Sequence, residues 1–351
     1  MRRWPDSALL RGVLGLVVGG LAGATFAALH SPLPWMIGPL VTLAALRVGG
    51  APLGALPGSR QVGQWIVGTA LGLYFTPVVA RSLAGVWPLL VAAALFAIAV
   101  GYASGLLLAR LAGIDRTTAI FASVPGGAAE MSTLAERFGG RVDQVAAAQS
   151  LRILIVVVVV PYAFAWSNVH GADPYVPGIT ETRPAGLALL LGATLVGGFA
   201  ARALRVPNAF VLGALAVAIP LTASHVDLSA VPGGLSAAAQ VLLGSALAAR
   251  FAPEFLRGAH RFVGAVVATI VLAIAASAAF GVGLATLTGQ SPPTLVLGTA
   301  PGGIAEMCLT AKALSLGVPL VTACHVTRVV ALLLLTAPLF ERVRAYRRSA
   351  R

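Results

Sequence analysis

Long apolar stretches alternate with short polar segments along the whole chain. Because a bilayer core of about 30 Å needs roughly 20 helical residues, each stretch of that length predicts a transmembrane helix. The first half contains five such stretches, at residues 9–29, 33–50, 62–80, 86–109 and 144–165. The second half contains five more, at residues 186–203, 207–223, 235–250, 262–287 and 319–340. We therefore predict an all-α, polytopic integral membrane protein.

Each half also carries an apolar stretch that is interrupted by Pro-Gly-Gly, at residues 117–138 and 292–315. The sequence SVPGGAAEM of residues 123–131 returns 176 residues later as TAPGGIAEM at residues 299–307. A fixed offset of this kind indicates a duplicated unit. We expect two transmembrane repeats joined by a linker and followed by a basic tail, and their boundaries are 8–165, 166–183, 184–340 and 341–351.

The composition agrees with a membrane protein and argues against a soluble one. Hydrophobic residues make up 58% of the chain and charged residues only 10%, with a mean hydropathy of +0.92, whereas about a quarter of a soluble domain is charged. The net charge is +13, but the basic residues are scattered between apolar stretches and form no basic stripe with interleaved aromatic residues. We therefore expect a lipid bilayer, and not nucleic acid, as the partner of this charge.

The arginines predict an orientation, because cytoplasmic loops of membrane proteins collect Lys and Arg. Arg2, Arg3 and Arg11 place the N-terminus in the cytoplasm, and the basic tail does the same for the C-terminus, so we predict a multi-pass protein of the inner membrane. The linker carries Asp173 and Glu181 against a single arginine, which indicates an external segment.

Each half then crosses the membrane an odd number of times, which makes the repeats inverted and each Pro-Gly-Gly segment a re-entrant hairpin. If these segments cross fully instead, the halves are parallel six-span repeats. The inverted arrangement assigns most loop arginines to the cytoplasmic side, namely Arg47, Arg60, Arg110, Arg116, Arg137, Arg141, Arg202, Arg205, Arg250, Arg257 and Arg261. Arg81, at the end of the third predicted helix, does not fit this arrangement.

The Pro-Gly-Gly segments are the first candidates for a functional site, since irregular backbone at membrane depth is tolerated only beside protein or a water-filled cavity. Discontinuous helices in inverted repeats place substrate sites near the midplane. We expect backbone groups there to be presented by glycines, which admit positive φ and close approach. These are Gly126, Gly127, Gly302 and Gly303. The alternative is a pair of packed bends without a ligand.

Glu130 and Glu306 are the two acidic residues that fall clearly within the predicted membrane region. An intramembrane carboxylate is costly and therefore points to function. Either residue could bind a coupling ion, as a proton taken up by a buried carboxylate or as sodium beside backbone carbonyls. The alternative is structural, in which the two glutamates form ion pairs with Arg152 and Arg328, the two arginines near the middle of predicted spans.

Arg152 and Arg328 are also candidate substrate-binding residues, because a guanidinium group matches carboxylate or phosphate. Gln149 lies three residues before Arg152, and His325 occupies the matching place before Arg328, so each pair shares one face of its helix. We assign Gln149 and His325 to the same candidate site. One alternative is that His325 is a packed polar residue without a functional role. A second is that it transfers protons.

At its two Pro-Gly-Gly and Glu-Met motifs the chain resembles the AbrB family of membrane proteins, which consist of two such units. The resemblance covers nearly the whole chain. Members carry the labels regulator of gene expression and ammonia monooxygenase. The oxygenase label gains no support, because the five histidines are dispersed and a metal site needs clustered ligands. The family is also similar in plan to cation/proton antiporters and anion transporters, which implies alternating access by analogy.

We therefore predict a secondary transporter of a small, anionic solute, coupled to protons or sodium, without a cofactor or resident metal. The chain has no GxxxxGKS or GxxxxGKT motif, so energy from an ion gradient is expected. The main alternative is a membrane-bound regulator or sensor that acts through a partner protein. An enzyme is disfavoured because no nucleophile and base stand at a catalytic spacing. The sequence leaves open a channel mechanism and a homo-oligomer.

Overall fold

The computed structural model describes residues 7–167, 169, 171, 177–251 and 260–349, and within these ranges the regular secondary structure consists of helices joined by loops, without a strand. Arg2, Arg3, Asp173, Arg257 and Arg351, which entered the predicted orientation, lie outside the described residues. The helices of the first half are α1 (Ala8–Ala28), α2 (Pro34–Val48), α3 (Ser59–Gly72), α4 (Pro77–Gly85), α5 (Trp87–Ala112), α6 (Arg116–Ser123), α7 (Ala128–Arg137) and α8 (Val142–Trp166). Those of the second half are α9 (Pro184–Ala203), α10 (Ala209–Ala223), α11 (Gly233–Ala248), α13 (His260–Thr288), α14 (Pro292–Thr299), α15 (Ile304–Ala313) and α16 (Val318–Ser349).

The prediction of a polytopic helical protein is confirmed. Six of the described helices, α1, α5, α8, α9, α13 and α16, are long and apolar enough to cross a membrane. Helices α2, α10 and α11 are apolar but shorter. At a rise of about 1.5 Å per residue such helices reach only about 23 Å, so they fall short of a full bilayer core. Helix α16 continues past residue 340 to Ser349, so the predicted start of the tail lies inside a helix.

The predicted third span, residues 62–80, is wrong in its extent. Helix α3 ends at Gly72, and α4 begins at Pro77 after a bend of 89°. Pro77 stands at the first position of α4, where its missing N–H costs no hydrogen bond. Arg81 therefore lies on the exposed surface of a short, turned helix.

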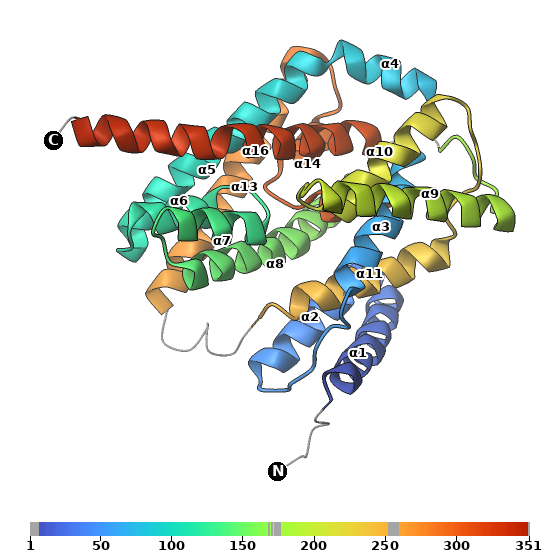
Figure 1. Ribbon diagram of the computed structural model, residues 1–351, viewed down its shortest axis with the longest axis horizontal. Coiled ribbons are helices and arrows are strands. Elements are labelled where there is room, and N and C mark those ends of the chain that lie inside the picture. The colour runs from blue at the N-terminus through green and yellow to red at the C-terminus, as the bar shows by residue number, and fades with distance from the viewer. Residues whose placement is uncertain (1–6, 168, 170, 172–176, 252–259, 350–351) are drawn as a thin grey trace.

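Helices from the two sequence halves pack into two mixed bodies. We call α1, α2, α3, α9, α10 and α11 the scaffold body, in which α3 packs against α10 and α2 packs against α11. We call α5 to α8 and α13 to α16 the hairpin body. Small residues allow the close helix packing that membrane proteins rely on, since a side chain at Gly38 would strike the backbone of Ala22 at 2.7 Å. In Figure 1 the scaffold body lies to the right and below, and most of the hairpin body lies to the left.

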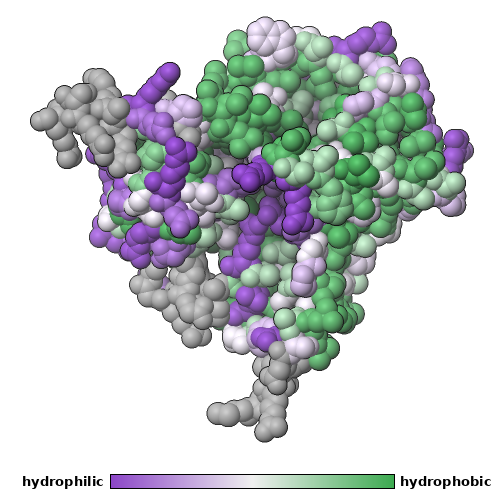
Figure 2. All heavy atoms as spheres, viewed as in Figure 1, coloured by the Kyte–Doolittle hydropathy of each residue, from purple (hydrophilic) through white to green (hydrophobic). Residues whose placement is uncertain are grey.

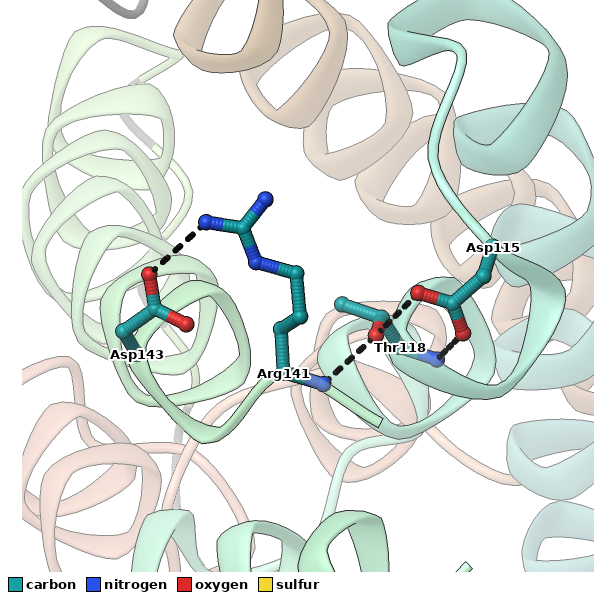
Figure 3. A network of polar contacts seen from close by, with 4 residues as sticks. All are labelled: Asp115, Thr118, Arg141 and Asp143. Carbon is teal, nitrogen blue, oxygen red and sulfur yellow. Dashed lines mark hydrogen bonds and ion pairs between the residues drawn. The ribbon is translucent and has the colours of Figure 1, made fainter. Parts of the chain in front are cut away.

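Each Pro-Gly-Gly segment is a re-entrant hairpin of two short helices. In the first, α6 and α7, the hydroxyl of Thr118 joins the two ends: it donates to Asp115 Oδ2 at 2.6 Å and accepts from the amide of Arg141 at 2.8 Å (Figure 3). In the second, α14 and α15, the hydroxyl of Thr294 accepts from the amide of Gly317 at 3.2 Å. The chain thus returns to the place where each hairpin began.

The two hairpins begin at opposite ends of the hairpin body. Helix α8 starts beside the first hairpin and leads to Gly171, whose amide donates to Leu314 O at the base of the second hairpin (3.0 Å). Helix α16 starts beside the second hairpin and reaches Glu341, which pairs with Arg137 at the end of the first hairpin (3.3 Å). Helices α8 and α16 therefore run in opposite directions (Figure 1), and the repeats are inverted.

Candidate functional site

The glycines of the motif make room for the glutamate and the methionine that follow them. A side chain at Gly126 would meet the end of Met131 at 2.6 Å, and one at Gly302 would meet Met307 at 2.5 Å. A side chain at Gly127 or at Gly303 would overlap the carboxylate of the glutamate three residues later. The expected positive φ is wrong, since φ is −68° at Gly127 and −80° at Gly303. Close approach therefore explains these glycines.

Arg152 and Arg328 hold the two hairpins in the same way. Arg152 donates from Nη1 to Val124 O at 3.1 Å and from Nη2 to Gly126 O at 3.2 Å. Arg328 donates from Nη1 to Ala300 O at 2.7 Å and from Nη2 to Gly302 O. These carbonyls follow the ends of α6 and α14, where helix carbonyls lack partners and the helix dipole is negative. Each guanidinium group therefore caps a half-helix.

The ion-paired alternative for the two glutamates is wrong. The ion pairs between described side chains, Arg137–Glu341, Arg141–Asp143 and Arg183–Glu181, are all exposed. Glu306 lies near enough to Arg152 and Arg328 to interact with both electrostatically, but without a direct ion pair. Its carboxylate folds back over Gly303 at the start of α15 instead, where the positive end of the helix dipole favours an anion.

Gln149 and His325 also bind hairpin backbone, one turn before the arginines. Gln149 Nε2 donates to Phe121 O and to Val124 O, both at 2.9 Å. His325 Nε2 lies 3.2 Å from Leu297 O, the matching carbonyl of the second hairpin. Both side chains are fully buried. The structure thus places them behind the arginines, against α6 and α14.

The hairpin tips enclose a small central cavity of about 50 Å³. It brings together most of the predicted site: the four glycines, Arg152, Arg328 and Glu306. The scaffold body adds four polar residues that lie on its opposite wall, Arg60, Gln64, Asn208 and Arg250. Four arginines and one glutamate therefore surround one cavity between the two bodies.

A wider opening of about 530 Å³, here called the vestibule, adjoins this cavity through Gly126, Gly127 and Asn208, which line both. Glu130 and Arg205 are its charged residues. Its remaining wall is largely apolar and includes Met131, Leu134, Val329, Leu332 and Leu333. Figure 2 shows a hydrophilic strip between more apolar surfaces in the middle of this face of the molecule.

The two hairpins differ in exposure although their sequences and contacts match. In α7 only Met131 and Ala135 are buried, and Glu130 is half-buried beside the vestibule. In α15 every residue from Ile304 to Ala311 is buried, and Glu306 is only 9% exposed. The site is therefore open along the first hairpin and covered along the second.

Arg60 and Arg250 were predicted on the cytoplasmic side and not in the site, whereas both line the central cavity. Arg60 donates from Nη2 to Asn208 Oδ1 at 3.1 Å, and Gln64 donates to the same oxygen at 3.2 Å. Asn208 stands before α10 in the left-handed region, with φ of 48°, which asparagine tolerates better than most residues. A repeat comparison could not find these arginines, because Ser236 and Tyr74 occupy the matching positions.

Comparison with known proteins supports the resemblance noted in the sequence. The model of a family described as "Transition state regulatory protein AbrB" matches residues 35–344. "Uncharacterized protein YhjN" of Bacillus subtilis (strain 168) is 28% identical over 364 residues, which cover 96% of this chain and 94% of that protein. "Putative regulator AbrB" of Escherichia coli (strain K12) is 26% identical over 331 residues, with coverage of 93% and 94%.

Proposed function

This chain is a helical membrane protein of the AbrB family, and we propose that it is a secondary transporter of a small anionic solute, driven by a proton or sodium gradient. It acts as a carrier and not as an enzyme. The observation that supports this proposal most directly is the central cavity, in which two inverted hairpins and four arginines meet between the scaffold body and the hairpin body.

The unequal exposure of the two hairpins supports alternating access. Inverted repeats allow a protein to adopt two conformations in which the halves exchange roles. Here the first hairpin borders the vestibule while the second is covered. Exchange of these environments opens the cavity along the second hairpin and closes it along the first, so a bound solute changes sides.

Glu130 and Glu306 are the proposed coupling-ion residues. Each lies at the start of a half-helix at a hairpin tip, one beside the vestibule and one beside the cavity. A carboxylate at this depth is costly when charged, so its occupancy by a proton or sodium changes the energy of each conformation. We further propose that the protein lies in the cytoplasmic membrane with both termini in the cytoplasm, and the distribution of its basic residues supports this orientation.

The test is flux into proteoliposomes under an imposed pH or sodium gradient, with small organic and inorganic anions offered in turn. Wild type is compared with Glu306→Gln and with Glu341→Gln, a matched exposed control. We expect gradient-driven uptake in wild type and in the control, and its loss in Glu306→Gln. Uptake by Glu306→Gln equal to wild type would remove Glu306 as a coupling residue.

A membrane-bound regulator is the alternative function, and its support is the name of the Escherichia coli relative and the description of the family. The same experiment separates the two. Absence of flux for every anion and gradient, from protein that melts cooperatively, would contradict transport and favour a regulator that acts through a partner.

A further inference from the structure

We infer that the transported solute is an organic anion with two parts, an oxyanion head group held in the central cavity and a compact apolar body held in the vestibule. This inference rests on the proposed function for its physiological meaning, but it concerns binding. It assigns Arg60 and Arg250, on the scaffold body, to the head group together with Arg152 and Arg328 on the hairpin body.

The central cavity is built for negative charge. Glu306 is the one acidic residue among the described residues that line it, against four arginines. Arg152 is 6% exposed and Arg328 is 4% exposed, so both charges are withdrawn from water. Charges in such surroundings attract an anion far more strongly than charges in bulk solvent.

The arginines also keep unused hydrogen-bond donors. Nε of Arg152, Nε of Arg328 and Nη1 of Arg250 are buried and have no hydrogen-bond partner among the described residues. An unpaired buried donor is costly, and donors of charged groups more so. Carboxylate and phosphate oxygens accept several such bonds at once, so a bound oxyanion would relieve this cost.

Because of the scaffold arginines, the head group contacts both bodies. Arg60 lines the cavity, where its Nη2 donates to Asn208 Oδ1 at 3.1 Å. Arg250 interacts electrostatically with Arg60 and with Glu306, so the charges of the two bodies influence each other. An anion between them would bind the scaffold body and the hairpin body together.

The sizes of the two spaces indicate where each part of the solute lies. The cavity of about 50 Å³ has room for a small polar head group, and the vestibule of about 530 Å³ has room for more. Ligand pockets typically enclose about 300–1,000 Å³ and are mainly apolar with a few placed polar groups. Met131, Leu134 and Leu332 give the vestibule that character. An inorganic anion would leave this apolar wall unused.

The test measures binding to purified protein in detergent by isothermal titration calorimetry. The probes are sodium salts of acetate, hexanoate, dodecanoate and phosphate, together with hexylphosphonate and neutral hexanol. We expect hexanoate or hexylphosphonate to bind at least tenfold more tightly than acetate, phosphate or hexanol. The comparison of hexanoate with hexylphosphonate identifies the head group.

Variants then test each part separately. Arg60→Gln and Arg250→Gln should weaken hexanoate binding on the order of tenfold or more through lost charge-assisted bonds. Arg110→Gln, on an exposed position of α5, is the matched control and should bind as wild type does. Leu333→Trp should fill the vestibule and weaken the binding of hexanoate but not that of acetate. Unliganded melting temperatures show whether each variant is folded.

Several results would overturn the inference. Equal affinity for acetate and hexanoate would contradict a role of the vestibule. An affinity that rises steadily with chain length up to dodecanoate, and that is unchanged in Arg60→Gln and Arg250→Gln, would indicate nonspecific partition of detergent-like molecules. Tight hexanoate binding without flux would support the inference and contradict transport, whereas gradient-driven flux of inorganic ions alone would support transport and contradict the inference.

Discussion

The guanidinium group of Arg328 stabilises the second hairpin by capping α14, and replacement of Arg328 by methionine tests this. The substitution keeps an apolar stem of similar length but removes the donors to Ala300 O and Gly302 O. Hydrogen bonds from a charged group contribute about 1.5–3 kcal/mol each, so the loss of both bonds predicts a decrease in stability of about 3–6 kcal/mol. Methionine also removes the cost of burying the arginine charge, and this offsets part of the loss. We therefore expect the free energy of unfolding to fall by about 3 kcal/mol.

The assay is the free energy of unfolding in mixed micelles, followed by tryptophan fluorescence. The free energy of unfolding of Arg328→Lys should lie between those of wild type and Arg328→Met, because an ammonium group lacks the planar fork that reaches two carbonyls at once. Arg152→Met should lower the free energy of unfolding less than Arg328→Met does, because the two bonds of Arg152, at 3.1 and 3.2 Å, are longer than the 2.7 Å bond from Arg328 to Ala300 O. Arg110→Gln should leave the unfolding free energy unchanged.

A stable Arg328→Met would refute this reasoning. If its unfolding free energy matched that of Arg110→Gln while anion binding was lost, Arg328 would serve the ligand and not the hairpin. If both stability and binding matched wild type, neither role would hold for Arg328.

Three further changes test the packing, the hairpin base and the exposure of the site. Gly213→Ala should destabilise by about 1–3 kcal/mol, because its side chain would strike the backbone of α9, whereas Gly192→Ala points into open space and should leave the melting temperature unchanged. Thr118→Val should speed amide hydrogen exchange in α7, since it removes the hydroxyl that joins the two ends of the hairpin; unchanged exchange would contradict that role. In a cysteine-free background, Thr133→Cys in the vestibule should react with a water-soluble maleimide at least tenfold faster than Leu309→Cys in the covered hairpin, and equal rates would contradict their unequal exposure.

Much of this fold could be predicted because membrane helices leave strong local signals. Apolar length identified most helices to within a few residues, as for α8, predicted at residues 144–165 and observed at 142–166. The repeat then paired the hairpins. The bend after Gly72 was missed because residues 62–80 are apolar on both sides of it, although Pro77 inside this stretch is a signal for a break. The mixing of the halves into two bodies was also hidden, since contacts between α3 and α10 leave no periodic trace in either segment.

Prediction of the site succeeded where the repeat supplied a second copy. Glu306, Arg328 and the glycines entered the candidate site because each recurs at the fixed offset, and the structure brings them together around one cavity. What the sequence could not supply was the partner of each arginine. Glutamate is the usual expectation for an intramembrane arginine, but the carbonyls after α14 had lost their helical partners and lie nearer.

The two arginines that escaped prediction, Arg60 and Arg250, break the symmetry of the repeats. Arg60 and Arg250 have no counterpart in the other repeat, so exchange of the hairpin environments does not recreate them on the covered side. The hairpin arginines, in contrast, recur in both halves, and each donates to carbonyls of its own hairpin. In the proposed transport cycle, an anion would therefore have four arginines available when the cavity opens along the first hairpin, and fewer when it opens along the second. Under that proposal the difference would favour capture from the side of the vestibule and release on the other side, so we expect the loss of Arg60 and Arg250 to make the affinities measured from the two sides of the membrane more nearly equal.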